Sequence, residues 1–153
     1  MNIEKGIFTS TKLRFCRIFI LNKFFNMITI AENKQYSLKV DITKNRAFLK
    51  INGFWRNKED IPGYLQDWDE AVNKLTKGFT LLTDASDMTI HPGDVRDVHS
   101  KAQEKIVKAG VKKVAELHKA SVAEMQLNSV SNESGMPKKN FNDREEAMNW
   151  LDI

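Results

Sequence analysis

The chain of 153 residues has little cysteine and no long apolar stretch, and each shortage excludes a class of protein. Cys16 is the single cysteine, so an intrachain disulfide and a four-cysteine metal site are excluded, and a reducing compartment fits. No window approaches the ~18 consecutive apolar residues that a membrane-spanning helix needs. These shortages predict a cytoplasmic protein of one domain, with no metal or other cofactor.

The positive charge is concentrated at one end of the chain. The formal net charge is +4, and residues 1–26, with five basic side chains and one acidic one, account for all of it. The remaining 127 residues balance 19 basic against 19 acidic side chains. A nucleic-acid-binding domain is expected to carry a positive patch on its folded surface. We therefore expect no nucleic-acid partner.

Residues 1–26 are basic and rich in Phe and Ile, which leaves more than one interpretation open. A cleaved signal peptide is disfavoured because Arg17 interrupts the apolar run and no small-residue cleavage site follows it. One alternative is a segment that contacts a membrane surface; the other, which we favour, is that translation begins at Met27. We expect an N-terminal extension over residues 1–26 and a folded domain over residues 27–153.

The folded domain alternates strand-like and helix-like patterns. Alternating apolar and polar residues predict strands, the first two forming a hairpin, and apolar residues at helical spacing predict amphipathic helices. In chain order we expect strands at 36–42, 47–52, 79–84, 111–118 and 138–141, and helices at 57–75, 92–109, 121–127 and 142–151. Ser121 and Asn142 are expected to cap the last two helices, and the turn-rich stretch 128–139 to be a mobile loop.

This order predicts the fold class. Strands that alternate with helices favour parallel pairing after the first hairpin. We therefore expect an α/β fold, with one mixed, mostly parallel sheet of 4–5 strands and four helices packed against it.

The loop after the central strand is the expected binding surface, because open α/β sheets bind ligands just past the ends of their strands. It lies between the apolar strand and the helix that opens on Pro92. Its polar side chains are the candidate residues for a partner or ligand: Asp84, Ser86, Asp87, Thr89, His91 and Asp94. Trp55, which follows the hairpin, is a further candidate for a pocket or partner surface, although packing against the first helix is the alternative.

The same loop offers little for catalysis or for metal binding. Asp84, Ser86 and His91 suggest a catalytic triad, but no G-x-S-x-G turn surrounds the serine. His91 and His99 are eight residues apart, which exceeds two helical turns if both lie on the helix, so we expect no shared metal ion. Acidic residues in the first turn of that helix oppose a bound phosphate. We therefore expect no enzyme.

Two motifs resemble the STAS family, and within it the SpoIIAA-like, SEC14-like branch. The stretch 81–86 (LLTDAS) is similar to the family's strand ending in Asp-Leu-Ser, and 141–147 (FNDREEA), followed by Trp150 and Leu151, looks like that branch's closing helix. The resemblance covers roughly residues 28–151. It implies a STAS-like fold without catalysis that binds a partner protein, or a small ligand such as a nucleotide or lipid.

The chain departs from the antagonists of that family at one point. The resemblance implies a phosphorylated serine in an Asp-Ser-Ser-Gly run at the start of the second helix. Here the matching residues, 89–94 (TIHPGD), contain no serine, which puts that form of regulation in doubt.

The leading hypothesis is a non-catalytic, STAS-like regulatory module that docks a protein partner through residues 85–94 and the second helix. The alternative is a protein that binds a lipid or nucleotide in a pocket between the hairpin and the helices. The sequence identifies neither the partner nor the ligand.

Overall fold

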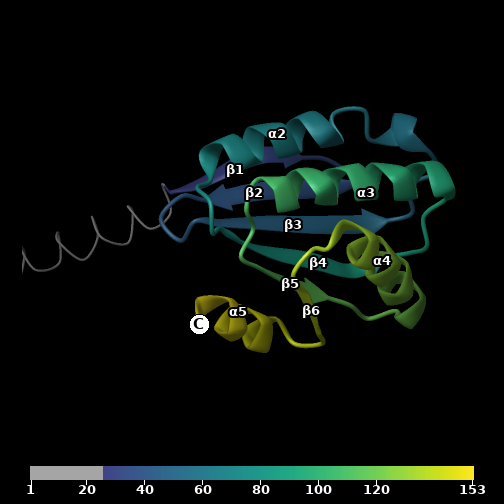
Figure 1. Cartoon of the computed structure of the whole chain (residues 1–153). Helices are drawn as coiled ribbons and strands as arrows, with labels where there is room; N and C mark the ends of the chain where they lie inside the picture. The colour runs from purple at the N-terminus through teal and green to yellow at the C-terminus, as the bar shows by residue number, and fades with distance from the viewer. Residues whose placement is uncertain (1–25) are drawn as a thin grey trace, which may run out of the picture.

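The computed structural model describes residues 26–153 as an α/β fold built on one six-stranded sheet (Figure 1). The strands are β1 (Met27–Glu32), β2 (Tyr36–Asp41), β3 (Arg46–Gly53), β4 (Thr80–Met88), β5 (Lys113–Leu117) and β6 (Lys138–Phe141). The helices are the short 3-10 turn η1 (Lys58–Asp60), α2 (Tyr64–Lys74), α3 (Gly93–Lys108), α4 (Ser121–Ser134) and α5 (Arg144–Asp152). The expected fold class is confirmed.

The strands lie in the sheet in the order of the sequence, β1-β2-β3-β4-β5-β6. The first three pair antiparallel as two hairpins, and β3 to β6 pair parallel, as the alternating elements predict. Helices α2, α3 and α4 cover one face, and α5 lies against β4–β6 on the other (Figure 1). The carboxyl ends of the four parallel strands therefore meet at one edge of the sheet.

The sheet has one strand more than the sequence predicts, because β1 precedes the expected hairpin. Its residues pair with β2 through a register shift between Thr29 and Ala31, and none of its side chains is fully buried. An edge strand with a bulge and a half-exposed surface gives little alternation for sequence reasoning to detect. The expectation for the extension at residues 1–26 lies, except for Asn26, outside the described residues.

The main core lies between the sheet and the helices above it. Alternate residues of β2 and β3, such as Leu38, Val40 and Leu49, meet Trp68 and Ala71 from α2 and Ile106 from α3. Trp68 is fully buried at the centre of the apolar stripe of its helix, as its spacing predicts. A smaller cluster lies on the other face, where α5 contributes Ala147 and Leu151 against Leu82 and Ala115.

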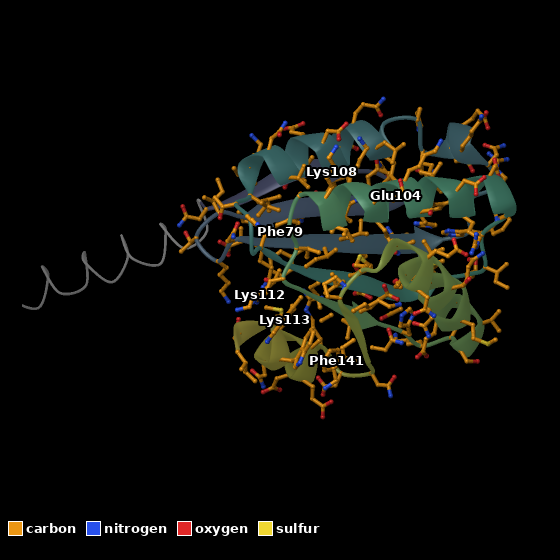
Figure 2. All side chains as sticks on the ribbon, viewed as in Figure 1. Phe79, Glu104, Lys108, Lys112, Lys113 and Phe141 are labelled. Carbon is orange, nitrogen blue, oxygen red and sulfur yellow. The ribbon has the colours of Figure 1, made fainter. Side chains whose placement is uncertain are left out.

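The aromatic side chains of the smaller cluster are covered by lysines. Phe141 and Trp150 lie with ring centroids 5.5 Å apart, and the ammonium of Lys113 lies 4.9 Å from the Trp150 ring. Figure 2 shows Lys113 and Phe141 on the side of the sheet that α5 covers. Lysine on and beside an edge strand discourages pairing with another chain, so this basic surface has a structural explanation.

Two expected loops are shorter than predicted. The strand β4 continues past Asp84 to Met88, because Asp87 and Met88 still pair with Asn52 and Gly53 of β3. The stretch expected as a mobile loop after residue 127 is helical instead, and α4 ends only at Gly135, whose left-handed φ of 70° suits glycine. Ser131 is buried under α4 and Asn128 is half-buried there, and these inward polar side chains hide the helical period.

Both predicted helix caps are wrong in position. Ala120, not Ser121, precedes α4, and it makes no side-chain capping bond. Asp143, not Asn142, caps α5 by accepting hydrogen bonds from the backbone of Glu145 and Glu146. No helix within residues 26–153 combines the length and the apolar character needed to cross a bilayer.

Candidate functional site

The expected binding loop is reduced to four residues, Thr89–Pro92, at the carboxyl edge of the sheet. Its backbone is attached to the neighbouring loop, since the Thr89 N–H donates to the Gly53 carbonyl at 3.1 Å. The helix α3 begins at Gly93, directly after Pro92. The loop is therefore a short, tethered link between β4 and α3.

Three of the predicted site residues are exposed beside this loop. The Asp87 carboxylate lies 3.4 Å from the Lys50 ammonium, and Asp94 accepts a hydrogen bond from the backbone N–H of Lys58 at 3.1 Å. Thr89 is also exposed. These residues are placed where a partner could reach them.

Asp84 and Ser86 lie apart from the loop. The Asp84 carboxylate lines a groove of about 250 Å³ on the face of the sheet beside α5, and lies 3.9 Å from the Arg144 guanidinium. Its other contact is local, because it accepts the Ser86 backbone N–H at 3.0 Å. The imidazole of His91 instead contacts His99 and Gly53, so the three residues considered as a catalytic triad are not assembled as one.

His91 and Trp55 are buried, with 2 % and 0 % of their surface exposed. The expectation of an accessible side chain is therefore wrong for His91, and Trp55 follows the other interpretation given for it, since it packs against Tyr64 of α2. His91 precedes α3 instead of lying on it, and this allows its ring to fold back toward the helix. Its Nδ1 lies 2.9 Å from Nε2 of His99. The expectation that these histidines lie apart is therefore wrong, because it assumed that both lie on one helix.

The two imidazoles and the Trp55 indole form one stacked cluster. The histidine rings are within 5° of parallel, and both stack on Trp55 at centroid distances of 4.7 and 5.0 Å. Trp55 is fixed in turn by its Nε1–H, which donates to the carbonyls of Gln35 and Asn52 at 3.1 Å. Burial lowers the pKa of His91, and burial together with the neighbouring His91 lowers the pKa of His99 to about 3.

Two tyrosines continue this aromatic cluster under α2. Tyr64 packs edge-on against both Tyr36 and Trp55. Burial raises the pKa of the Tyr36 hydroxyl, which donates a hydrogen bond to Asp67, and burial also raises the pKa of Tyr64. Both hydroxyls therefore stay protonated at neutral pH, and that of Tyr36 is a structural hydrogen-bond donor.

The loop is also fastened to α4 by one side chain. The Gln126 amide accepts the His91 backbone N–H at 2.9 Å and donates to the His91 carbonyl at 2.6 Å. His91 is thus held by two contacts, its imidazole by His99 and its backbone by Gln126. This pair of contacts gives the short loop a defined position.

Four exposed apolar side chains that the sequence analysis missed lie on the loop of His91 or on segments that contact it. Among residues 26–153, seven large apolar side chains are exposed, and four of them are Phe54 (56 %), Ile90 (51 %), Val122 (52 %) and Met125 (71 %). The Phe54 ring lies 6.4 Å from that of His91, Ile90 precedes His91, and Val122 and Met125 lie within one helical turn of Gln126. We call these four residues the apolar edge.

The apolar edge left only a weak signal in the sequence. Phe54 and Ile90 lie in short loops, where one exposed apolar side chain is common and does not by itself indicate a binding site. Val122 and Met125 lie on α4, which carries buried polar residues and so gives no clear period to show which positions face outward. Only the fold brings these residues together.

A buried polar network lies beneath α4, next to this edge. The Glu116 carboxylate contacts Nε2 of His118 and accepts a hydrogen bond from Lys138 at 2.8 Å. Lys138 also donates to Asn128, and Asn140 donates to Asn128 and Glu124. Within the described residues, no cluster of three or more His, Cys, Asp or Glu side chains could hold a metal ion.

The space between the hairpin and the helices does not fit the small-ligand alternative. The cavity there measures about 20 Å³ and is lined by residues such as Tyr64, His99 and Glu116. Ligand pockets usually measure hundreds of Å³, and this volume suits about one water molecule. A lipid or nucleotide at that position is therefore not supported.

Three solved structures are similar to this chain. One is an anti-sigma factor antagonist from Mycobacterium paratuberculosis, with 11 % identity and a TM-score of 0.52 over 83 % of this chain and 95 % of that one. The second is an uncharacterised DUF3478-family protein with a SpoIIAA-like fold from Shewanella loihica, with 14 % identity and a TM-score of 0.55 over 79 % of this chain and 97 % of that one. The third is SiaC of Pseudomonas aeruginosa, with 10 % identity and a TM-score of 0.51 over 75 % of this chain and 98 % of that one. No known protein family and no curated protein matches the sequence. The expected STAS-like, SpoIIAA-like fold is confirmed.

Proposed function

We propose that this chain, with its SpoIIAA-like fold, is a non-catalytic regulatory module that binds a partner protein at the apolar edge. The main observation in support is that four of the seven exposed large apolar side chains of residues 26–153 lie on the short loop of His91 or on the two segments that contact His91. Contiguous exposed apolar residues commonly mark protein interaction sites. The partner should therefore present an apolar contact surface of its own.

The polar candidates from the sequence form the rim of this site. Asp87, Thr89 and Asp94 are exposed next to the apolar edge, and polar groups around an apolar centre are typical of interfaces between proteins that associate reversibly. The proposal therefore keeps the expected loop, and it adds Phe54 and the first turns of α4 to the expected contact surface.

The structural comparison favours a regulatory partner. One protein of similar fold is an anti-sigma factor antagonist, which acts on another protein. At 11 % identity this likeness concerns the fold, so the kind of partner is part of the proposal. We propose that the partner is a regulatory protein of the cytoplasm, and that binding changes the activity of that partner.

The test compares two surface variants in which exposed apolar residues are replaced by serine, three in one variant and two in the other. The edge variant carries Phe54→Ser, Ile90→Ser and Met125→Ser, and the control variant carries Ile42→Ser and Ile153→Ser, which are exposed apolar residues elsewhere. The tagged full-length chain is cross-linked in its own cells, purified, and analysed by quantitative mass spectrometry. We expect the wild type and the control to retain the same partner and the edge variant to lose it at least tenfold. Equal recovery by all three proteins would reject the apolar edge.

A further inference from the structure

The proton arrangement of the buried histidine pair is fixed by its contacts. The Nε2 of His91 lies 3.1 Å from the Gly53 carbonyl, which can only accept, so this nitrogen carries the hydrogen. In a neutral ring the His91 Nδ1 is then an acceptor. The Nε2 of His99, 2.9 Å away, must therefore donate to it. Both rings are neutral, with the hydrogen on Nε2.

An additional proton is costly in this arrangement. On Nδ1 of His91 it would require the hydrogen of His99 to move from Nε2 to Nδ1, and it would create an imidazolium on a side chain that is 2 % exposed. On Nδ1 of His99 it would create an imidazolium on a side chain that is 4 % exposed. A buried charge that lacks an opposite charge beside it is costly. The pKa of His99 is correspondingly low, at about 3.

The groups that face the pair do little to relieve that cost. From β2 and α2, Tyr36 and Tyr64 present neutral hydroxyls, and the nearby Asp67 is engaged by Tyr36. From β5, Glu116 lines the same cavity as His99, but its carboxylate is already bound by His118 and Lys138. The remaining neighbours are uncharged: Trp55, Phe54, Thr83, Gln103 and Gln126.

The pair is placed where it controls the proposed docking site. His91 belongs to the loop Thr89–Pro92, between the exposed Ile90 and the start of α3, and its ring lies beside Phe54. Releasing His91 would free Ile90 and would also break the contact of Gln126, which joins the loop to α4. The position of the apolar edge thus depends on the neutral state of the two histidines.

We propose that His99 is a positioning residue for the docking site: it holds the loop Thr89–Pro92 through neutral His91, and uptake of protons by the pair opens that loop. This inference rests on the proposed function for its biological meaning, since the apolar edge is the site it regulates. The physical event, local opening of four residues coupled to protonation, can be measured without the partner.

The size of the effect follows from proton linkage. In the closed form the pKa of His91 is lowered and that of His99 is lowered to about 3, and a ring that opening exposes to solvent returns toward its ordinary pKa of 6.5. Opening that exposes one fully shifted ring is then favoured about 10-fold more at pH 5.5 than at pH 7.5, and opening that exposes both rings is favoured by up to about 100-fold. The direction is fixed: because burial depresses both pKa values, the closed loop loses stability as the pH falls below 6.5.

The experiment is amide hydrogen exchange on the full-length chain at pH 7.5, 6.5 and 5.5, with each rate divided by the intrinsic rate at that pH. We expect protection of the Thr89 and His91 amides to fall by between about 10-fold and about 100-fold over this range, while amides of β2 and β3 stay protected. Constant protection at residues 89 and 91 would overturn the inference, and so would an equal loss across the whole sheet.

Two glutamine variants separate titration from simple destabilisation. His99→Gln keeps an N–H donor near His91 but cannot titrate, so the pH response should drop by about 10-fold. His118→Gln makes the same change at another buried histidine and should leave the wild-type response intact. If both variants reduce the response equally, the inference is rejected.

Nitrogen-15 spectra of the histidine rings at pH 7.5 provide a readout that does not depend on folding stability. Both His91 and His99 should be the neutral tautomer with the hydrogen on Nε2, and a hydrogen on Nδ1 of either ring would contradict the inference. Failure of this inference is distinguishable from failure of the proposed function. A loop that opens in acid while the edge variant keeps its partner rejects only the proposed function, and an unresponsive loop with partner loss in the edge variant rejects only the inference.

Discussion

The helices α2 and α4 cover the same face of the sheet but are held there by different forces. Under α2 the contacts are apolar and aromatic, with Tyr64, Trp68 and Ala71 buried. Under α4 the buried apolar residues are smaller, and hydrogen bonds join Gln126 to His91 and Asn128 to Lys138. Two further bonds tie the outer side of α4 to α3, from Arg96 to Ser129 and to Glu133.

This difference teaches where stability and function are located. Apolar burial stabilises α2 in proportion to area, without regard to exact position. Hydrogen bonds and ion pairs define the position of α4 closely but add little net stability, since their groups were already solvated in the unfolded chain. Binding surfaces are drawn from such less stable regions. The apolar edge lies on α4 and the loop that it contacts, which agrees with this pattern.

The largest effect is expected under α2. Trp68→Ala should lower the free energy of unfolding by roughly 3–5 kcal/mol, because it leaves a large cavity in the main core, as measured by urea denaturation. Trp68→Phe is the matched control and should cost less than half as much. Its lost indole N–H finds no hydrogen-bond partner among the described residues, so no bond is broken. A smaller loss for Trp68→Ala than for the phenylalanine variant would refute the assignment of this side chain to the core.

The next effect concerns the charges under α4. Glu116→Ala should cost about 3 kcal/mol, because it leaves the Lys138 ammonium, whose side chain is 6 % exposed, without its carboxylate. The double variant Glu116→Leu with Lys138→Met removes both charges and should recover at least half of that loss in urea denaturation. If the double variant is less stable than Glu116→Ala, the stability loss in Glu116→Ala is not caused by the uncompensated charge of Lys138, and this prediction is wrong.

A smaller effect is expected at the contact between α4 and the loop. Gln126→Ala removes both hydrogen bonds to the His91 backbone, and should lower the free energy of local opening of the loop by about 1–2 kcal/mol. Hydrogen exchange at His91 measures this change, and the core strands should be unaffected. Asn132→Ala, at an exposed site on the same helix, is the control. Equal exchange in the two variants would show that Gln126 does not hold the loop.

The smallest effect on stability, with the largest expected effect on binding, lies at the apolar edge. Phe54→Ser and Met125→Ser should each change the free energy of unfolding by less than about 0.5 kcal/mol, because both side chains are exposed. Thermal denaturation checks this expectation. A loss of several kcal/mol in either variant would mean that the residue packs within the domain instead of awaiting a partner.

The predictability of each element followed its pattern of burial. The strand β2 and the helix α3 were predicted closely, since one apolar face with a clean period defines each of them. The apolar face of α2 was predicted too, but its expected start at residue 57 is wrong, because residues 58–60 form the separate turn η1 and the helix begins at Tyr64. The strand β1 and the second half of α4 were missed, because β1 is half-exposed and α4 buries Ser131 among polar partners. Periodicity reports burial of apolar side chains, and it fails where the buried contacts are polar.

The loop of the candidate site was predicted in place, while its role in binding stays a prediction. It lies between β4 and α3, as the sequence indicated, and Asp87, Thr89 and Asp94 are exposed there. His91 and Trp55 are instead buried in one stacked cluster. His91 can turn inward because it precedes the helix, which begins only after Pro92. Residue spacing alone does not predict that direction.

The amino-acid sequence by itself determined the order of strands and helices and the fold class, because the alternation of apolar and polar residues acts locally along the chain. Only the tertiary structure decided which groups from distant segments meet: the imidazole of His91 with His99 and Trp55, and the backbone of His91 with Gln126 of α4. The reason is physical, since a pairwise contact depends on the path of the backbone between its members. The proposed site consists of such contacts.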